Sequence, residues 1–175
     1  MHQKFQELKL KSNLRMPPQK VLQIYNLLDK EGVKIWVDGG WGVDALLEQQ
    51  TREHADLDIA IDHTQETKML GLLDTQDYKV VQTNEQTKHQ YVLGDGAHLI
   101  DVHVFGFDEA GNNVYGIKYS KESLTGTGKI NGHEVRCISP EWAVKFHQHA
   151  KMGETDRHDL RLLSEKFGIS LPAGV

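Results

Sequence analysis

The sequence predicts an α+β domain with a mixed, mostly antiparallel sheet flanked by helices. Three observations support this fold class. Short apolar segments typical of strands lie between turn residues along the middle of the chain, helical segments lie before, among and after them, and the two kinds do not alternate regularly. Because a doubly wound parallel fold needs regular alternation, the sequence argues against one.

The expected elements follow from turn and capping residues. Proline is tolerated in a first helical turn, so Pro17-Pro18 begins a helix that Gly32 ends. Gly94-Asp95-Gly96 indicates one hairpin, and Asn131-Gly132 indicates a second hairpin with a type I′ turn. The other expected helices are 41–48, 65–73, 140–152 and 155 to about 168. The expected strands are 34–37, 57–62, 78–81, 90–93, 98–105, 114–119, 129–130 and 133–138.

The length of 175 residues suits one domain with a substantial core. We divide the chain into a polar N-terminal extension over 1–16, a main domain over 17–138, and a short C-terminal helical segment over 139–175. The first part is polar and basic, and is expected to be a frayed tail or a short helix.

Composition excludes several classes of protein. A net charge of -5 argues against general nucleic-acid binding, which depends on neutralising phosphates. The chain has no basic tract for a membrane surface and no apolar run long enough for a signal peptide or a membrane span. A lone cysteine, Cys137, allows no internal disulfide and is expected to pack within a strand. We therefore predict a cytoplasmic location.

Acidic residues recur in the expected strand over 57–62. Because side chains alternate between the faces of a strand, Asp56 and Asp58 lie on one face, about 6.5 Å apart. Two carboxylates at that spacing can converge on a hard cation such as Mg²⁺. A solvated strand face is an equally good explanation of the pair alone, although aspartate is disfavoured in strands.

A third aspartate interrupts the apolar strand over 98–105. Asp101 shares its face with His103, while the opposite face is apolar. If this strand lies beside the one over 57–62, Asp101 completes a cluster of three carboxylates, and like charges packed so closely need a cation. Taken alone, Asp101 is better explained as an acid on an edge strand.

Gly39-Gly40 lies where an expected strand turns into an expected helix. Glycines allow close backbone approach, and a helix start presents free N–H groups and the positive end of its dipole, which together suit a phosphate. Taken alone, the pair is better explained by plain turn chemistry. The combination of the glycines, the acidic pair and Asp101 is much more specific than any one of them.

This combination resembles the nucleotidyltransferase superfamily that includes DNA polymerase β. The stretch from Trp36 to Asp44, with Thr51 to Asp58, resembles its small antibiotic-modifying members, the lincosamide nucleotidyltransferases and the 2″-aminoglycoside nucleotidyltransferases. The resemblance is strong over about residues 33–62, is fair through Phe105, and then becomes sparse.

The resemblance implies a site and a reaction. Asp56 and Asp58 would hold Mg²⁺, as two ions about 4 Å apart, and Asp101 would ligate the second ion and act as general base. A nucleoside triphosphate, ATP first, would transfer its nucleoside monophosphate to a hydroxyl of a small molecule and release pyrophosphate.

The resemblance also implies residues that bind the nucleotide. Gly39, Gly40 and Trp41 would form the phosphate turn, and Arg52, near the acidic cluster, would contact phosphate, although as an isolated residue it is equally well explained as a surface arginine. Many superfamily members have serine where Trp41 stands, so here backbone N–H groups would have to replace its hydroxyl. His54 could buttress the acidic loop, although a surface or core role explains it as well.

Several alternatives stay open at this stage. A lincosamide acceptor ranks ahead of an aminoglycoside, on the similarity between Trp36 and Asp58. Other hypotheses are a minimal nucleotidyltransferase antitoxin that modifies a protein or tRNA, and an inert nucleotide-binding module. In related enzymes the C-terminal part helps to wall the acceptor site, in some of them across a homodimer. Asp156, His158 and Asp159 are candidates there for a cationic acceptor.

Overall fold

A computed structural model describes residues 14–148 and 152–171, which form a mixed sheet with helices on both faces. The strand order is β3-β4-β5-β2-β1-β8-β7, and β6 pairs with β5. The strands are β1 (Ile35–Asp38), β2 (Leu57–Asp62), β3 (Lys79–Thr83), β4 (Gln90–Gly94), β5 (Leu99–Phe107), β6 (Asn113–Gly116), β7 (Gly126–Ile130) and β8 (His133–Cys137). Among these residues β2–β5 and β1–β8 pair in parallel and the other pairs are antiparallel, so the predicted fold class is confirmed.

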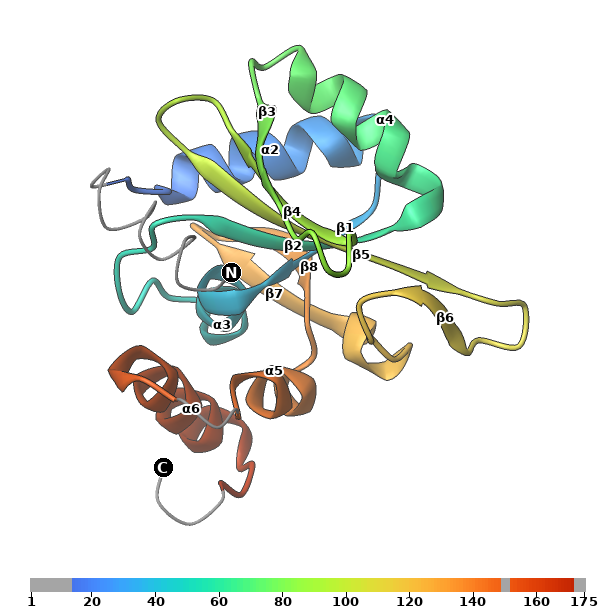
Figure 1. The fold of residues 1–175 in the computed structure, drawn as a ribbon. Coiled ribbons are helices and arrows are strands. Elements are labelled where there is room, and N and C mark those ends of the chain that lie inside the picture. Colours follow the sequence, from blue (N-terminus) through green and yellow to red (C-terminus); the bar gives the residue numbers. More distant parts are fainter. Residues whose placement is uncertain (1–13, 149–151, 172–175) are drawn as a thin grey trace.

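Helices cover the sheet on both sides, as Figure 1 shows. One face carries α2 (Pro18–Lys30) and α4 (His63–Asp74), and the other carries α3 (Gly39–Leu47), α5 (Pro140–His147) and α6 (Glu154–Phe167). A short 3-10 helix, η1, spans Glu122–Thr125. The middle of β2 is buried on both faces, since Ile59 and its neighbour Ala60 have no exposed surface, whereas Asp58 and Asp62 on the acidic face are half-buried.

Local signals place several elements well. The strand over 57–62 has the predicted bounds. Asn131 and Gly132 both have positive φ, as a type I′ turn requires, and they connect β7 to β8. The Asp95 carboxylate accepts the backbone N–H groups of Ala97 and His98 and so closes the β4–β5 hairpin.

Several expected elements have wrong bounds; the strand predicted over 114–119, for example, ends at Gly116. The helix predicted over 140–152 ends at His147, and its C-cap is Gln148. Met152 is not helical, and residues 149–151 lie outside the described ones. The strand predicted at 129 begins at Gly126. Its glycines hide the strand signal, but Gly128 is needed, because a Cβ there would lie 2.2 Å from the carbonyl oxygen of Ala45 in α3.

Both ends of the described part of the chain contact the body of the domain. Met16 is buried, and its backbone N–H donates to the carbonyl oxygen of His54. The rest of the predicted extension, residues 1–13, lies outside the described residues. At the other end, α5 and α6 pack on each other and on α3. No helix in the described part of the chain has the length and apolar character needed to cross a bilayer.

Candidate active site

Strand register brings two of the predicted acids together. In the parallel pair of β2 and β5, Asp58 lies opposite Asp101, and in the antiparallel pair of β1 and β2, Asp38 lies opposite Asp58. Three aspartates therefore occupy one row across neighbouring strands. The condition that the sequence set for a carboxylate cluster, that the strand of Asp101 lie beside the strand of Asp58, is therefore met.

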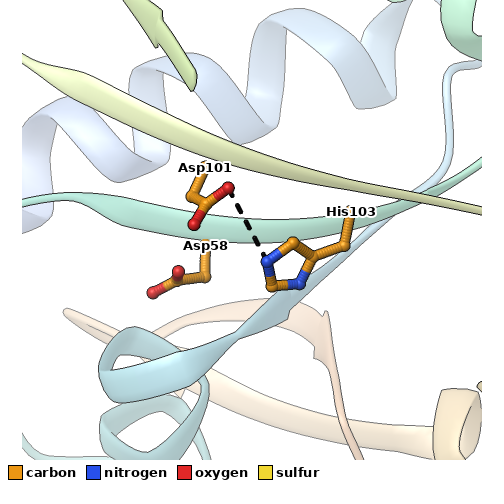
Figure 2. Close-up of side chains that lie close together, drawn as sticks. All are labelled: Asp58, Asp101 and His103. Atoms are coloured by element: carbon orange, nitrogen blue, oxygen red, sulfur yellow. Dashed lines mark ion pairs between the residues drawn. The ribbon is translucent and has the colours of Figure 1, made fainter. Parts of the chain in front are cut away.

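A group of three potential metal ligands lies at this row. One ligand atom each from Asp58, Asp101 and His103 lies within 4.8 Å of the others. Figure 2 shows the Asp101 carboxylate and the His103 ring close together, with Asp58 on the adjacent strand. Asp101 is only 4% exposed, whereas Asp58 and His103 are half-buried. The oxygen and imidazole donors fit a divalent cation.

Asp56 directly precedes β2 and is also buried. In this structure it lies outside the group of three, so its role as a metal ligand stays a prediction. His103 is the residue that sequence reasoning missed. Its signal was present, because His103 shares a strand face with Asp101 and lies two residues further along.

The His103 ring is held on both nitrogens. Nε2 lies 3.7 Å from Oδ1 of Asp101 and 3.1 Å from Nε2 of Gln90, while Nδ1 lies 2.9 Å from the hydroxyl of Tyr119. Burial lowers the pKa of His103, but hydrogen bonds to Asp101 and Asp38 outweigh it and hold the pKa well above its usual value. The cause is the pair of carboxylates that flank the ring, since nearby negative charge favours the charged form of an imidazole.

A chain of hydrogen bonds continues from His103 to the glycine turn. The hydroxyl of Tyr119 donates to Oδ2 of Asp38 at 2.6 Å, and Oδ1 of Asp38 accepts the backbone N–H of Gly39 at 2.8 Å. Asp38 is the N-cap of α3. Burial raises the pKa of Asp38, but hydrogen bonds from His103 and Tyr119 outweigh this and lower it. These contacts couple the acidic row to the start of α3.

The two glycines begin α3 rather than precede it. Gly39 has a φ of 55°, and a Cβ there would lie 2.2 Å from Oδ2 of Asp58. A Cβ on Gly40 would lie 2.4 Å from Nη2 of Arg52 and 2.5 Å from Nδ1 of His54. The glycines are therefore required first by the protein's own side chains, which pack directly on the turn.

Trp41 belongs to the core, where its indole N–H donates to the carbonyl oxygen of Met16 and its ring packs on His54. Only its backbone N–H remains a candidate for phosphate contact, in agreement with the sequence interpretation. Apart from that of Gly39, which Asp38 accepts, the N–H groups of the first turn of α3 remain the predicted phosphate cradle.

Arg52 lies beside the turn and is bound by the C-terminal helix. Its Nε and Nη2 donate to Oδ1 and Oδ2 of Asp159 at 3.0 and 2.7 Å, and Nη1 lies 3.0 Å from Nδ1 of His54. His147 of α5 also lies 3.8 Å from Oδ2 of Asp159. The contact of Arg52 with phosphate stays a prediction. Asp159 is 1% exposed, so it is not available to an acceptor from solvent, contrary to the sequence hypothesis.

His54 is buried and buttresses the loop, as one of the two sequence hypotheses held. Its Nε2 lies 2.5 Å from Oδ2 of Asp44, and Oδ1 of Asp44 accepts both the backbone N–H and the hydroxyl of Thr51. Loop 51–54 is thus attached to α3 just before the acidic pair.

The chain is similar in sequence to known proteins. The sequence model of the aminoglycoside-2''-adenylyltransferase family matches residues 20–163. A lincosamide resistance protein of Staphylococcus haemolyticus is 29% identical over 160 residues, which cover 86% of this chain and 96% of that protein. A 2''-aminoglycoside nucleotidyltransferase of Klebsiella pneumoniae is 24% identical over 119 residues, covering 68% of this chain and 66% of that protein.

Solved structures share the fold. The lincomycin-bound crystal structure of the lincosamide antibiotic adenylyltransferase LnuA matches with a TM-score of 0.72 and 26% identity, covering 86% of this chain and 98% of that one. ANT(2")-Ia in complex with adenylyl-2"-tobramycin matches with a TM-score of 0.74 and 19% identity, covering 86% of this chain and 89% of that one.

Proposed function

The chain belongs to the aminoglycoside-2''-adenylyltransferase family, and we propose that it transfers a nucleoside monophosphate to a hydroxyl of a small-molecule antibiotic, a lincosamide first. The family membership confirms the resemblance found in the sequence and makes the chain a nucleotidyltransferase. A lincosamide is favoured because the lincosamide resistance protein aligns over nearly its whole length, whereas the aminoglycoside enzyme aligns over two thirds of its own.

The observation that carries the proposal is the position of Asp58 opposite Asp101 on parallel strands, beside the glycine turn. One carboxylate alone would be an ordinary strand residue. Two carboxylates in register and an imidazole, with ligand atoms within 4.8 Å of each other, form a donor set for a divalent cation.

We assign Asp58, Asp101 and His103 as the residues that would hold Mg²⁺, together with Asp56 as the sequence predicts. When bound, the ion would neutralise the phosphate charge and lower the pKa of the acceptor hydroxyl. The backbone N–H groups of the first turn of α3 and the guanidinium of Arg52 would hold the triphosphate of ATP.

Asp101 is the proposed general base. Its carboxylate would accept the proton of the acceptor hydroxyl, whose oxygen would attack the α-phosphorus in line. The bond from the α-phosphorus to the bridging oxygen breaks as the new bond forms, and pyrophosphate leaves. Gln90 donates to Oδ2 of Asp101 at 3.1 Å and so orients this carboxylate.

A pyrophosphate-release screen tests the proposal. It crosses the four ribonucleoside triphosphates with lincomycin, clindamycin, kanamycin and tobramycin, with Mg²⁺ or with a chelator. We expect release with ATP and a lincosamide, loss of release with the chelator, and a product heavier than the drug by one nucleoside monophosphate. Asp101→Asn is the negative control. Release of pyrophosphate without a nucleotidylated product would contradict the proposal.

An aminoglycoside acceptor is the second candidate, because the matching family is defined by 2''-adenylyl transfer. The same screen separates the two, since the drug in the nucleotidylated product is identified by its mass.

A further inference from the structure

We propose that Asp159 is a positioning residue for the nucleotide site: its carboxylate fixes the guanidinium of Arg52 against the glycine turn at the start of α3. The inference rests on the proposed nucleotidyl transfer. It gives the C-terminal helix α6 a role in nucleotide binding, whereas the sequence connected this segment only with the acceptor.

Arg52 and Asp159 form a bidentate ion pair, called the fork below. Nε and Nη2 of Arg52 donate to Oδ1 and Oδ2 of Asp159 at 3.0 and 2.7 Å. The side chain of Asp159 is 2% exposed and that of Arg52 is 26% exposed. Two parallel hydrogen bonds fix the plane of a guanidinium as well as its position, which a lysine at the same place could not reproduce.

The fixed guanidinium lies directly on the turn. Its Nη2 occupies the space that a Cβ on Gly40 would need, and its Nη1 lies 3.0 Å from Nδ1 of His54. Arginine has only donors, so Nδ1 of His54 must accept this bond and the ring proton must be on Nε2. Nε2 then donates to Oδ2 of Asp44 at 2.5 Å. Asp159 therefore determines, through Arg52, the orientation of His54.

The same contacts reach the acidic pair. Asp44 lies in α3 and also accepts two hydrogen bonds from Thr51, so loop 51–54, which leads to Asp56 and Asp58, is attached to α3. Loss of the fork would release the guanidinium from Gly40 and loosen both the first turn of α3 and this loop.

The charges of Asp159 and Arg52 indicate that loss of their contact would affect binding of the nucleotide. A buried carboxylate near a phosphate site repels the phosphate, so by itself Asp159 would weaken nucleotide binding. Asp159 is too deeply buried to contact a ligand directly. Its contribution must come from holding Arg52, which places a positive charge beside the N-terminal turn where phosphate is favoured.

Three variants test the proposal: Asp159→Asn, Arg52→Lys and the combination of both. The matched control is Asp29→Asn, because Asp29 of α2 pairs with Arg136 of β8 at 2.6 Å, away from the glycine turn. The measurements are kcat, KM for ATP, KM for the acceptor, and the Kd of Mg–ATP by calorimetry without acceptor. Asp159→Asn and Arg52→Lys should each raise KM and Kd for ATP about tenfold and leave the acceptor KM unchanged.

The combined variant should be no weaker in ATP binding than the weaker single variant, because both changes break one contact. Asp29→Asn should match the wild type. An unchanged KM and Kd for ATP in folded Asp159→Asn would overturn the proposal, and so would a change confined to the acceptor KM.

If Asp159→Asn does not fold, Asp159→Asn with Arg52→Gln carries the same expectation, since it leaves no uncompensated buried charge. A wild-type protein that neither binds nor turns over any nucleotide would overturn the proposed function itself. That failure is distinct because it appears before any variant is compared.

Discussion

Two buried carboxylates, Asp101 in β5 and Asp159 in α6, differ in what surrounds them. Asp159 has a guanidinium that matches both of its oxygens, at 3.0 and 2.7 Å. Asp101 has a second carboxylate opposite it on β2, an imidazole nitrogen at 3.7 Å and one amide. The comparison teaches that a buried acid with a complete partner holds that partner in place, whereas one placed beside another acid is arranged for a ligand.

The largest expected effect tests the ligand half of this comparison. Asp101→Asn should lower turnover by about 10³-fold, because the variant would lose the proposed general base and a proposed metal ligand. Its thermal midpoint should change little, because the loss of repulsion from Asp58 offsets the loss of attraction to His103. Pyrophosphate release and a thermal melt measure the two effects, with Asp108→Asn in the β5–β6 turn as the control. Wild-type turnover in Asp101→Asn would show that the base assignment is wrong.

The second prediction tests the structural half. Asp159→Ala should reduce the free energy of unfolding by about 3 kcal/mol, because Arg52 is left without its counter-charge in a largely buried position. Urea unfolding measures the loss. The combination with Arg52→Gln should recover part of it, since no unpaired charge remains. Equal stability of Asp159→Ala and wild type would remove the distinction between the two acids.

The third prediction concerns the imidazole. His103→Gln should weaken binding of Mn²⁺, used as a probe for the metal site, by about tenfold, because the site loses a nitrogen donor. Electron paramagnetic resonance titration gives the Kd. His98→Gln is the matched control, since His98 pairs with Asp95 in the β4–β5 hairpin. If both variants bind Mn²⁺ with the same Kd, His103 is not a ligand and only carboxylates hold the metal.

The smallest effect concerns a third acid, Asp95, which is satisfied locally. Burial raises the pKa of Asp95, but the side chain of His98 and the backbone N–H groups of Ala97 and His98 outweigh it and lower the pKa well below its usual value. A depressed pKa stabilises the fold above the unfolded value near 4, and this contribution is lost as the pH falls below it.

Asp95→Asn should therefore unfold more easily than wild type at pH 7, by about 1 kcal/mol, and the difference should shrink on acidification below about pH 4. Urea midpoints across that range measure it. A difference that is constant with pH would mean that the charge of Asp95 contributes nothing.

The elements that local rules govern were predictable. The strand over 57–62, the Asn131-Gly132 turn and the buried Cys137 lie where the sequence placed them. The pairing of Asp58 with Asp101 followed from the resemblance and from strand alternation. The end of α5 at His147 and the start of β7 at Gly126 did not follow, because no glycine or proline marks the first, and the glycine that α3 requires at position 128 hides the second.

Tyr119 and Asp159, which contact residues of the candidate site, could not be identified from the spacing of residues along the sequence. Tyr119 bonds Asp38 across 81 positions, and Asp159 bonds Arg52 across 107. Neither contact has a local signature, since a tyrosine after a short strand and an aspartate in an amphipathic helix are ordinary residues. Only the packing of α6 against α3 makes the second contact.

By itself the sequence determined that Asp56 and Asp58 share a strand face and that Gly39 and Gly40 lie where a strand turns into a helix, because side-chain alternation and the conformational freedom of glycine are properties of neighbouring residues. The tertiary structure decided which partner each charge has. Charges separated by a hundred positions interact only after the sheet has set its register and the C-terminal helices have packed, and the free energy of a buried charge depends on that partner.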